Sequence, residues 1–123
     1  MQIITILVAG RSNGTPGPAE VEVQILNEKG KLIKEISESI GNATDNFAEY
    51  QAVMRGLQIS QELFAEKTKE FEFEIKLSNE LVKKQLNNEL PIKEIGLIPH
   101  FIEIHNLQVT NFSNLKFTFV SLK

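Results

Sequence analysis

The sequence predicts an α/β domain: a mixed five-stranded sheet with helices packed on it. Three observations lead to this prediction. Residues 20–25 and 31–39 alternate apolar and polar side chains on either side of a short turn, as the strands of an antiparallel hairpin do. Apolar residues then recur at helical spacing over residues 45–65. Alternation returns over residues 71–77, so the helix is expected to cross to a parallel strand of the same sheet.

The first half of the chain divides into clear elements. Residues 3–8 are almost continuously apolar and β-branched, which is typical of a strand covered on both faces. A loop rich in Gly and Pro follows over residues 10–18, and the hairpin turns at residues 27–30. Thr44 and Asp45 are good N-cap residues for the long helix behind them.

The second half continues with shorter elements. We expect a helix over residues 79–87, a connecting segment over 91–99 and another helix over 99–106. A fifth strand is indicated by the spacing of Leu115, Phe117 and Phe119. Four of the eight Phe follow strand spacing, which favours a place in the core over a platform for stacked bases.

Length and composition narrow the functional classes. The 123 residues fit one domain, residues 1–123, and contain no Cys, which excludes a disulfide framework and a thiolate metal site. The formal charge of −3 argues against strong binding to nucleic acid irrespective of sequence. The apolar run at residues 3–9 is too short to span a membrane, so we expect a cytoplasmic protein without a membrane partner. Asp45 is the only Asp beside fifteen Glu, which disfavours aspartate chemistry.

Four segments together resemble the ribonuclease H family of RNA–DNA hybrid nucleases. They are residues 14–19 (GTPGPA), 43–50 (ATDNFAEY), 80–87 (ELVKKQLN) and 93–99 (KEIGLIP). The first is similar to the family's GNPGPA turn, the second to its ATNNxAEY helix start and the third to its ELVxxQLN helix. Their order and spacing are those of the family. The resemblance implies a ribonuclease H-like fold whose first three strands form an antiparallel meander, without the family's C-terminal helix.

The resemblance also implies a chemistry, hydrolysis of a phosphodiester by two Mg²⁺ ions that four carboxylates hold. Position by position, those carboxylates fall at Ala9, at Glu49, at Ser78 and beyond Lys123. Only Glu49 is retained. We therefore expect no cleavage of hybrids by this mechanism and no cofactor, with Mg²⁺ at Glu49 only if activity persists.

Other candidate metal ligands have simpler structural explanations. Three of the remaining glutamates fall at strand positions expected to face solvent, and a fourth begins a helix, where acidic residues are favourable. These are Glu20, Glu22, Glu72 and Glu80. His100 and His105 are five residues apart on a predicted helix and therefore lie on different faces, which argues against a metal pair.

Contacts with a hybrid are a separate implication of the resemblance. The turn at Gly14 and Thr15, and the helix start at Thr44 and Asn46, would approach the sugars and phosphates of the hybrid. Asp45 places a negative charge among them. Helix capping is the alternative explanation for Thr44 and Asp45.

A small basic cluster adds to these candidates. Lys83 and Lys84, together with Lys93, fall near a site that the family uses for its substrate. A solvated helix face explains the same lysines without any ligand.

Three functional hypotheses remain open. The first is a catalytically inactive ribonuclease H-like protein that binds RNA–DNA hybrids weakly. The second is an interaction scaffold, either a homodimer or a module for a protein partner, because a missing last helix would leave apolar surface and a sheet edge uncovered. The third, and least favoured, is a nuclease with relocated ligands.

Overall fold

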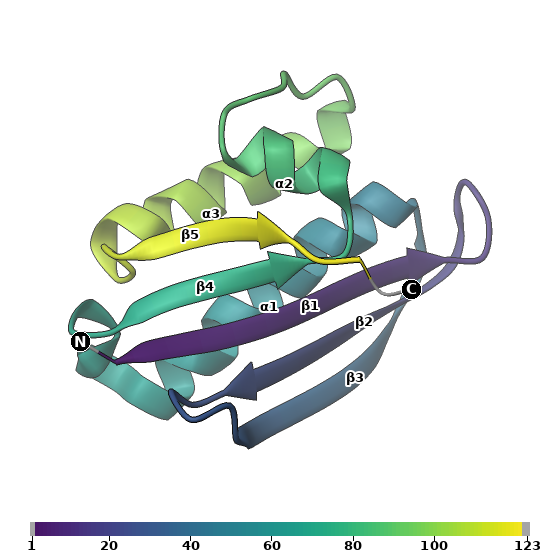
Figure 1. The fold of residues 1–123 in the computed structure, drawn as a ribbon. Helices are drawn as coiled ribbons and strands as arrows, with labels where there is room; N and C mark the ends of the chain where they lie inside the picture. Colours follow the sequence, from purple (N-terminus) through teal and green to yellow (C-terminus); the bar gives the residue numbers. More distant parts are fainter. Residues whose placement is uncertain (1, 122–123) are drawn as a thin grey trace.

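The computed structural model describes residues 2–121, which form a five-stranded sheet with helices on one side (Figure 1). The strand order is β3-β2-β1-β4-β5. β1 pairs antiparallel with β2 and parallel with β4, β2 pairs antiparallel with β3, and β4 pairs parallel with β5. The strands are β1 (Ile3–Ser12), β2 (Gly17–Leu26), β3 (Leu32–Ala43), β4 (Glu72–Leu77) and β5 (Leu115–Phe119). The predicted fold class is therefore confirmed.

The helices follow the predicted order. They are α1 (Asp45–Phe64), α2 (Glu80–Leu86) and α3 (Ile98–Thr110), with short 3-10 turns η1 (Ala65–Lys69) after α1 and η2 (Ile95–Leu97) before α3. α1 runs across the back of the sheet in Figure 1, with α3 behind β5. Within residues 2–121, no helix is long and apolar enough to span a membrane.

Two boundaries differ from the sequence prediction. β1 continues four residues beyond the predicted end at residue 8, and β2 begins inside the predicted loop of residues 10–18. The reason is that the ladder between these strands persists to the pair Ser12 and Ala19. Backbone pairing thus extends through small residues that the pattern assigned to a loop. α3 is also longer than predicted, because its apolar spacing continues through Leu107.

The apolar run of β1 predicts a strand that is covered on both faces, but only one of its faces is covered. Ile4, Ile6 and Val8 are buried on the side of α1, whereas Ile3 is 44% exposed and Leu7 is only half-buried. The difference arises because no helix within residues 2–121 crosses the front of the sheet (Figure 1). We call this front side the open face.

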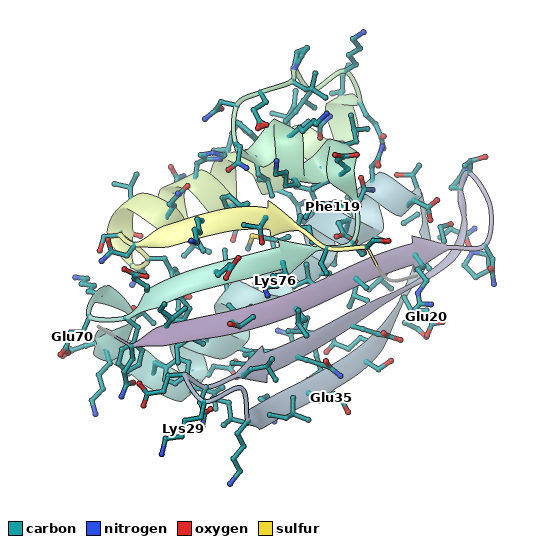
Figure 2. The ribbon with its side chains drawn as sticks, in the orientation of Figure 1. Glu20, Lys29, Glu35, Glu70, Lys76 and Phe119 are labelled. Carbon is teal, nitrogen blue, oxygen red and sulfur yellow. The ribbon has the colours of Figure 1, made fainter. Side chains whose placement is uncertain are left out.

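The open face is polar rather than apolar. Alternate residues of the strands place charged and amide side chains there, and Figure 2 shows them spread over the sheet, with Lys76 labelled. Examples are Glu22, Gln24, Glu74, Lys76 and Lys116. Exposed apolar side chains such as Ile3 lie singly among these polar groups, and the interaction scaffold stays a prediction.

Most of the predicted aromatic core is confirmed. Phe73 and Phe112 are buried and meet edge to face, with ring centroids 4.9 Å apart, and Phe117 is buried nearby. Phe71 is partly buried and packs against this core. Phe119 is the exception, since it is 41% exposed at the last residue of the edge strand β5 (Figure 2).

Candidate functional site

Glu49 carries a carboxylate into the interior of the protein. It lies on the second turn of α1, faces the ends of β1 and β4, and has no exposed surface. Its carboxylate accepts four hydrogen bonds from described residues. Oε1 accepts from the Gly10 amide (2.8 Å) and the Ser78 hydroxyl (2.9 Å). Oε2 accepts from the amides of Ser78 (2.7 Å) and Asn79 (3.2 Å).

These partners come from three elements that the sequence brings to one end of the sheet. Gly10 lies on β1, where a Cβ atom would stand 2.1 Å from the backbone carbon of Ala48, so only glycine allows α1 to approach this closely. Ser78 directly follows β4, and Asn79 is the N-cap of α2, where its side chain accepts from the Val82 amide. Glu49 therefore joins β1, α1 and the β4–α2 junction.

The electrostatics of Glu49 combine two opposing effects. Burial is the larger effect and raises the pKa of its carboxyl above the ordinary value of 4.5, while the hydrogen bonds from Gly10, Ser78 and Asn79 offset part of this rise. An ionised carboxylate offers about four lone-pair positions, two on each oxygen. All four are filled in this structure, so a cation could approach only by displacing a hydrogen bond.

The residues around Glu49 do not fit a pair of Mg²⁺ ions. Ala9 contributes a methyl group, and the Ser78 hydroxyl donates to Glu49 rather than offering a carboxylate. Within residues 2–121, no three His, Cys, Asp or Glu side chains come together in a way that could hold a metal. Hard dications need several negatively charged oxygen ligands, which this end of the sheet does not assemble.

A shallow hollow of about 460 Å³ opens above the buried carboxylate. It is lined by Gly10, Arg11, Asp45, Ser78 and Asn79. Among these residues, Arg11 carries the only positive charge. Its guanidinium forms an exposed ion pair with Glu22, with Nη2 3.0 Å from Oε1. The sequence does not single out Arg11, because one arginine in a turn-like segment has no pattern that marks it.

Asp45 does not cap α1, contrary to the sequence prediction. The N-cap is Thr44, whose hydroxyl accepts from the Phe47 amide (3.1 Å). Asp45 is the first residue of the helix, and its Oδ1 accepts from the Ser12 amide (2.7 Å). The carboxylate thus ties the end of β1 to the start of α1.

The polar residues at the helix starts are already paired within the protein. The Thr44 hydroxyl also donates to Glu94 Oε2 (2.9 Å). Asn46 Oδ1 accepts from the Asn79 side chain (2.8 Å), which links the starts of α1 and α2. The N-cap bond of Thr44 agrees with the capping explanation of that residue. Nucleic-acid contacts from Thr44 and Asn46 stay predictions.

The remaining predicted contact residues lie apart from one another. Gly14 and Thr15 are exposed in the short loop between β1 and β2. Lys83 and Lys84 are half-buried on the last turn of α2, and Lys83 Nζ lies 3.6 Å from Glu89 Oε1. Ser12 connects this loop to the hollow. Its hydroxyl donates to the carbonyl of Gly14 (2.8 Å), and the preceding residue, Arg11, lines the hollow.

The two histidines have separate surroundings. His100 Nε2 lies 2.7 Å from Gln51 Oε1, and the ring meets Phe47 edge to face. His105 Nδ1 lies 3.0 Å from the Phe101 carbonyl oxygen. Burial lowers the pKa of His100 below 6.5, against a smaller opposing effect of Glu103.

Solved structures with the same fold define the class of protein. LC11-RNase H1, isolated from compost by a metagenomic approach, is 34% identical and superposes with a TM-score of 0.92, covering 99% of this chain and 86% of that one. Its complex with an RNA/DNA hybrid gives a TM-score of 0.91 at 97% and 86% coverage. RNase H1 of the archaeon Halobacterium salinarum is 27% identical, with a TM-score of 0.86 and 98% and 86% coverage. The fold is ribonuclease H-like.

The family follows from the sequence as a whole. A family model described as "Reverse transcriptase-like" matches residues 7–123, and the chain belongs to this family. Ribonuclease HI of Halobacterium salinarum is 34% identical over 77 residues, which are 63% of this chain and 36% of that protein. The bifunctional protein Rv2228c of Mycobacterium tuberculosis is 25% identical over 118 residues, 95% of this chain and 31% of that protein. The chain thus spans about a third of the length of these curated relatives.

Proposed function

We propose that this domain is a ribonuclease H-like protein that binds RNA–DNA hybrids weakly and does not hydrolyse them by the two-metal mechanism. The observation that carries the proposal is the state of Glu49. Both of its oxygens are filled by hydrogen bonds from Gly10, Ser78 and Asn79. Ala9 and Ser78 stand where the resemblance places two further carboxylates.

The loss of activity is argued from the charge balance of the site. Two dications about 4 Å apart repel each other strongly, so they bind only where several carboxylates surround them. Of the described carboxylates at the hollow, Asp45 already accepts from the Ser12 amide, and Glu49 would lose four hydrogen bonds to bind an ion. We expect no metal cofactor under these conditions.

Weak hybrid binding is supported by a different set of observations. A structure 34% identical to this chain, with a TM-score of 0.91, is a complex with an RNA/DNA hybrid. The loop at Gly14 and Thr15 is exposed next to the hollow above Glu49. The net charge of −3 opposes a polyanion, so the affinity is expected to be low and to fall as salt rises.

A cleavage assay tests the catalytic part of the proposal. The purified protein is incubated with a hybrid labelled on its RNA strand, in Mg²⁺ and separately in Mn²⁺. We expect the RNA strand to stay intact. Cleavage that is present in the wild type and lost in a Glu49→Gln variant purified in parallel would overturn the proposal, and the variant also controls for a contaminating nuclease.

Fluorescence anisotropy with the same hybrid tests the binding part. We expect a complex at low salt that dissociates between about 50 and 200 mM salt, because phosphate contacts release counterions. An anisotropy that does not change at any protein concentration at the lowest salt would contradict hybrid binding.

A further inference from the structure

We propose that the hollow above Glu49 takes one backbone phosphate of the hybrid, held by the guanidinium of Arg11. This inference rests on the hybrid binding proposed above and specifies its site. The resemblance places metal ions at this end of the sheet, and the structure places a permanent cation there instead. Arg11 is thus inferred to supply the positive charge that a phosphate requires.

The position of Arg11 follows from the register of the sheet. Side chains two residues apart on a strand share a face, so Arg11 lies on the same face as Ala9. Ala9 pairs with Glu22 across the β1–β2 ladder, and Arg11 reaches along this ladder to Glu22. The guanidinium therefore lies on the same face of β1 as Ala9 and contacts Glu22, the residue that pairs with Ala9.

The lining of the hollow carries one positive charge, on Arg11, and one negative charge, on Asp45. Ala9 removes one negative charge, and the carboxylate of Glu49 is buried beneath four donors. Ser78 and Asn79 are neutral, which leaves Asp45 as the opposing charge on the lining. Asp45 Oδ1 already accepts from the Ser12 amide. A guanidinium presents paired donors to two phosphate oxygens, whereas the carboxylate of Asp45 weakens the binding.

Glu22 is the competitor for the guanidinium. The side chains of Arg11 and Glu22 are 64% and 50% exposed, and exposed ion pairs are weak because water and salt screen them. A phosphate can therefore replace the Glu22 carboxylate on Arg11. It follows that removing the charge of Glu22 strengthens the binding of the hybrid, while removing the charge of Arg11 weakens it.

The test measures hybrid binding by anisotropy for four single variants and one double variant. We expect Arg11→Gln to weaken binding about fivefold to tenfold at low salt, and to reduce the slope of log K against log salt by about one. Lys29→Gln is the matched control, because it removes the same charge at the opposite end of the sheet. Figure 2 shows Lys29 at one end and Glu20, which pairs with Arg11 in the β1–β2 ladder, at the other. We expect Lys29→Gln to bind like the wild type.

The second pair of variants tests whether Glu22 competes with the phosphate for the guanidinium of Arg11. Glu22→Gln is expected to tighten binding about threefold, and Glu28→Gln, at the far turn, to leave it nearly unchanged. In the Arg11→Gln background, the gain from Glu22→Gln should largely disappear, because no guanidinium remains to be released. Binding should also be unchanged in EDTA.

The outcomes separate this inference from the proposed function. If the wild type binds the hybrid and Arg11→Gln binds equally well, the phosphate site is wrong and the proposed function stands. Loss of binding in EDTA would likewise overturn the phosphate site, because it would assign the contact to a metal ion. If the wild type binds no hybrid at low salt, the proposed function fails, and the inference fails with it.

Discussion

At the scale of single residues, Glu49 and Ser78 act as one unit. The hydroxyl and amide of Ser78 donate to the two oxygens of the same carboxylate, at 2.9 and 2.7 Å. A buried charge is tolerated only when hydrogen bonds replace its lost hydration, and these two bonds provide half of that replacement. At the position where the resemblance places an Asp, Ser78 thus donates to Glu49, whereas an Asp carboxylate would repel it.

Glu49→Gln is expected to destabilise the fold. The amide group of Gln cannot accept from the donors that face one carboxylate oxygen, so buried donors would lose their partners. We expect the free energy of unfolding to fall by about 2–4 kcal/mol, measured by urea denaturation. The exposed Glu62→Gln is a suitable control and should change little. An unchanged or raised stability would show that Glu49 repels other carboxylates, as expected of a metal site.

His100 is expected to make stability depend on pH. Because burial lowers its pKa in the folded protein below 6.5, the unfolded chain binds more protons between the two values. The free energy of unfolding should therefore be highest above pH 6.5 and should fall as the pH drops through the lowered pKa. In denaturation curves across this range, His100→Gln should flatten the pH dependence. An equal slope in the variant would contradict this assignment.

The sequence predicts single residues unevenly. Glu49 could be located because it lies within a long motif, and Thr44 because an N-cap has a local signal. The role of Asp45 could not be predicted, since its partner, the Ser12 amide, is distant in the chain. The position of Arg11 could not be predicted either, because its neighbours Glu22 and the lining of the hollow come together only in the fold.

At the scale of elements, the contact between β1 and α1 positions the site. Gly10 allows the backbone of α1 to lie against β1. Gly56 of α1 allows a second close contact, since a Cβ atom on it would stand 2.9 Å from the side chain of Ile6. The first contact brings the Gly10 amide within 2.8 Å of Glu49. The close approach of strand and helix therefore builds the hydrogen-bonded site.

Gly10→Ala is expected to disrupt this contact. Its Cβ would stand 2.1 Å from the backbone of Ala48, which cannot move away as a flexible side chain could. We expect a loss of about 3 kcal/mol or more in the free energy of unfolding, or failure to fold. Gly96→Ala is the control, because nothing lies within 4 Å of the Cβ it adds, and its stability should stay close to that of the wild type. Equal stability of the two variants would contradict the close approach.

Elements with a strong period could be predicted together with their ends, as α1 and β4 show, whereas the ends of β1 and β2 at their shared loop could not. The hairpin, α1 and β4 follow from alternation or helical spacing that holds over many residues. The extension of β1 to Ser12 depends instead on pairing with β2, which local patterns do not report. The openness of one face of β1 also depends on what packs on the sheet, so an apolar run alone could not predict it.

At the scale of the whole molecule, the fold alone does not define an activity. The strand order, the long helix and the superpositions with TM-scores of about 0.9 are those of a ribonuclease H-like domain. Its stability comes from a core that needs no carboxylate cluster, so the cluster can be lost while the fold persists. The polar open face and the net charge of −3 are consistent with a weak, salt-dependent contact with nucleic acid.

A titration with Mg²⁺ followed by amide chemical shifts tests the central claim most directly. The amides of Gly10, Ser78 and Asn79 donate to Glu49, so they would report any ion that binds its carboxylate. We predict that these three resonances stay in place up to about 10 mM Mg²⁺, apart from the uniform drift caused by salt. A saturable shift confined to these amides, and lost in Glu49→Gln, would contradict the account.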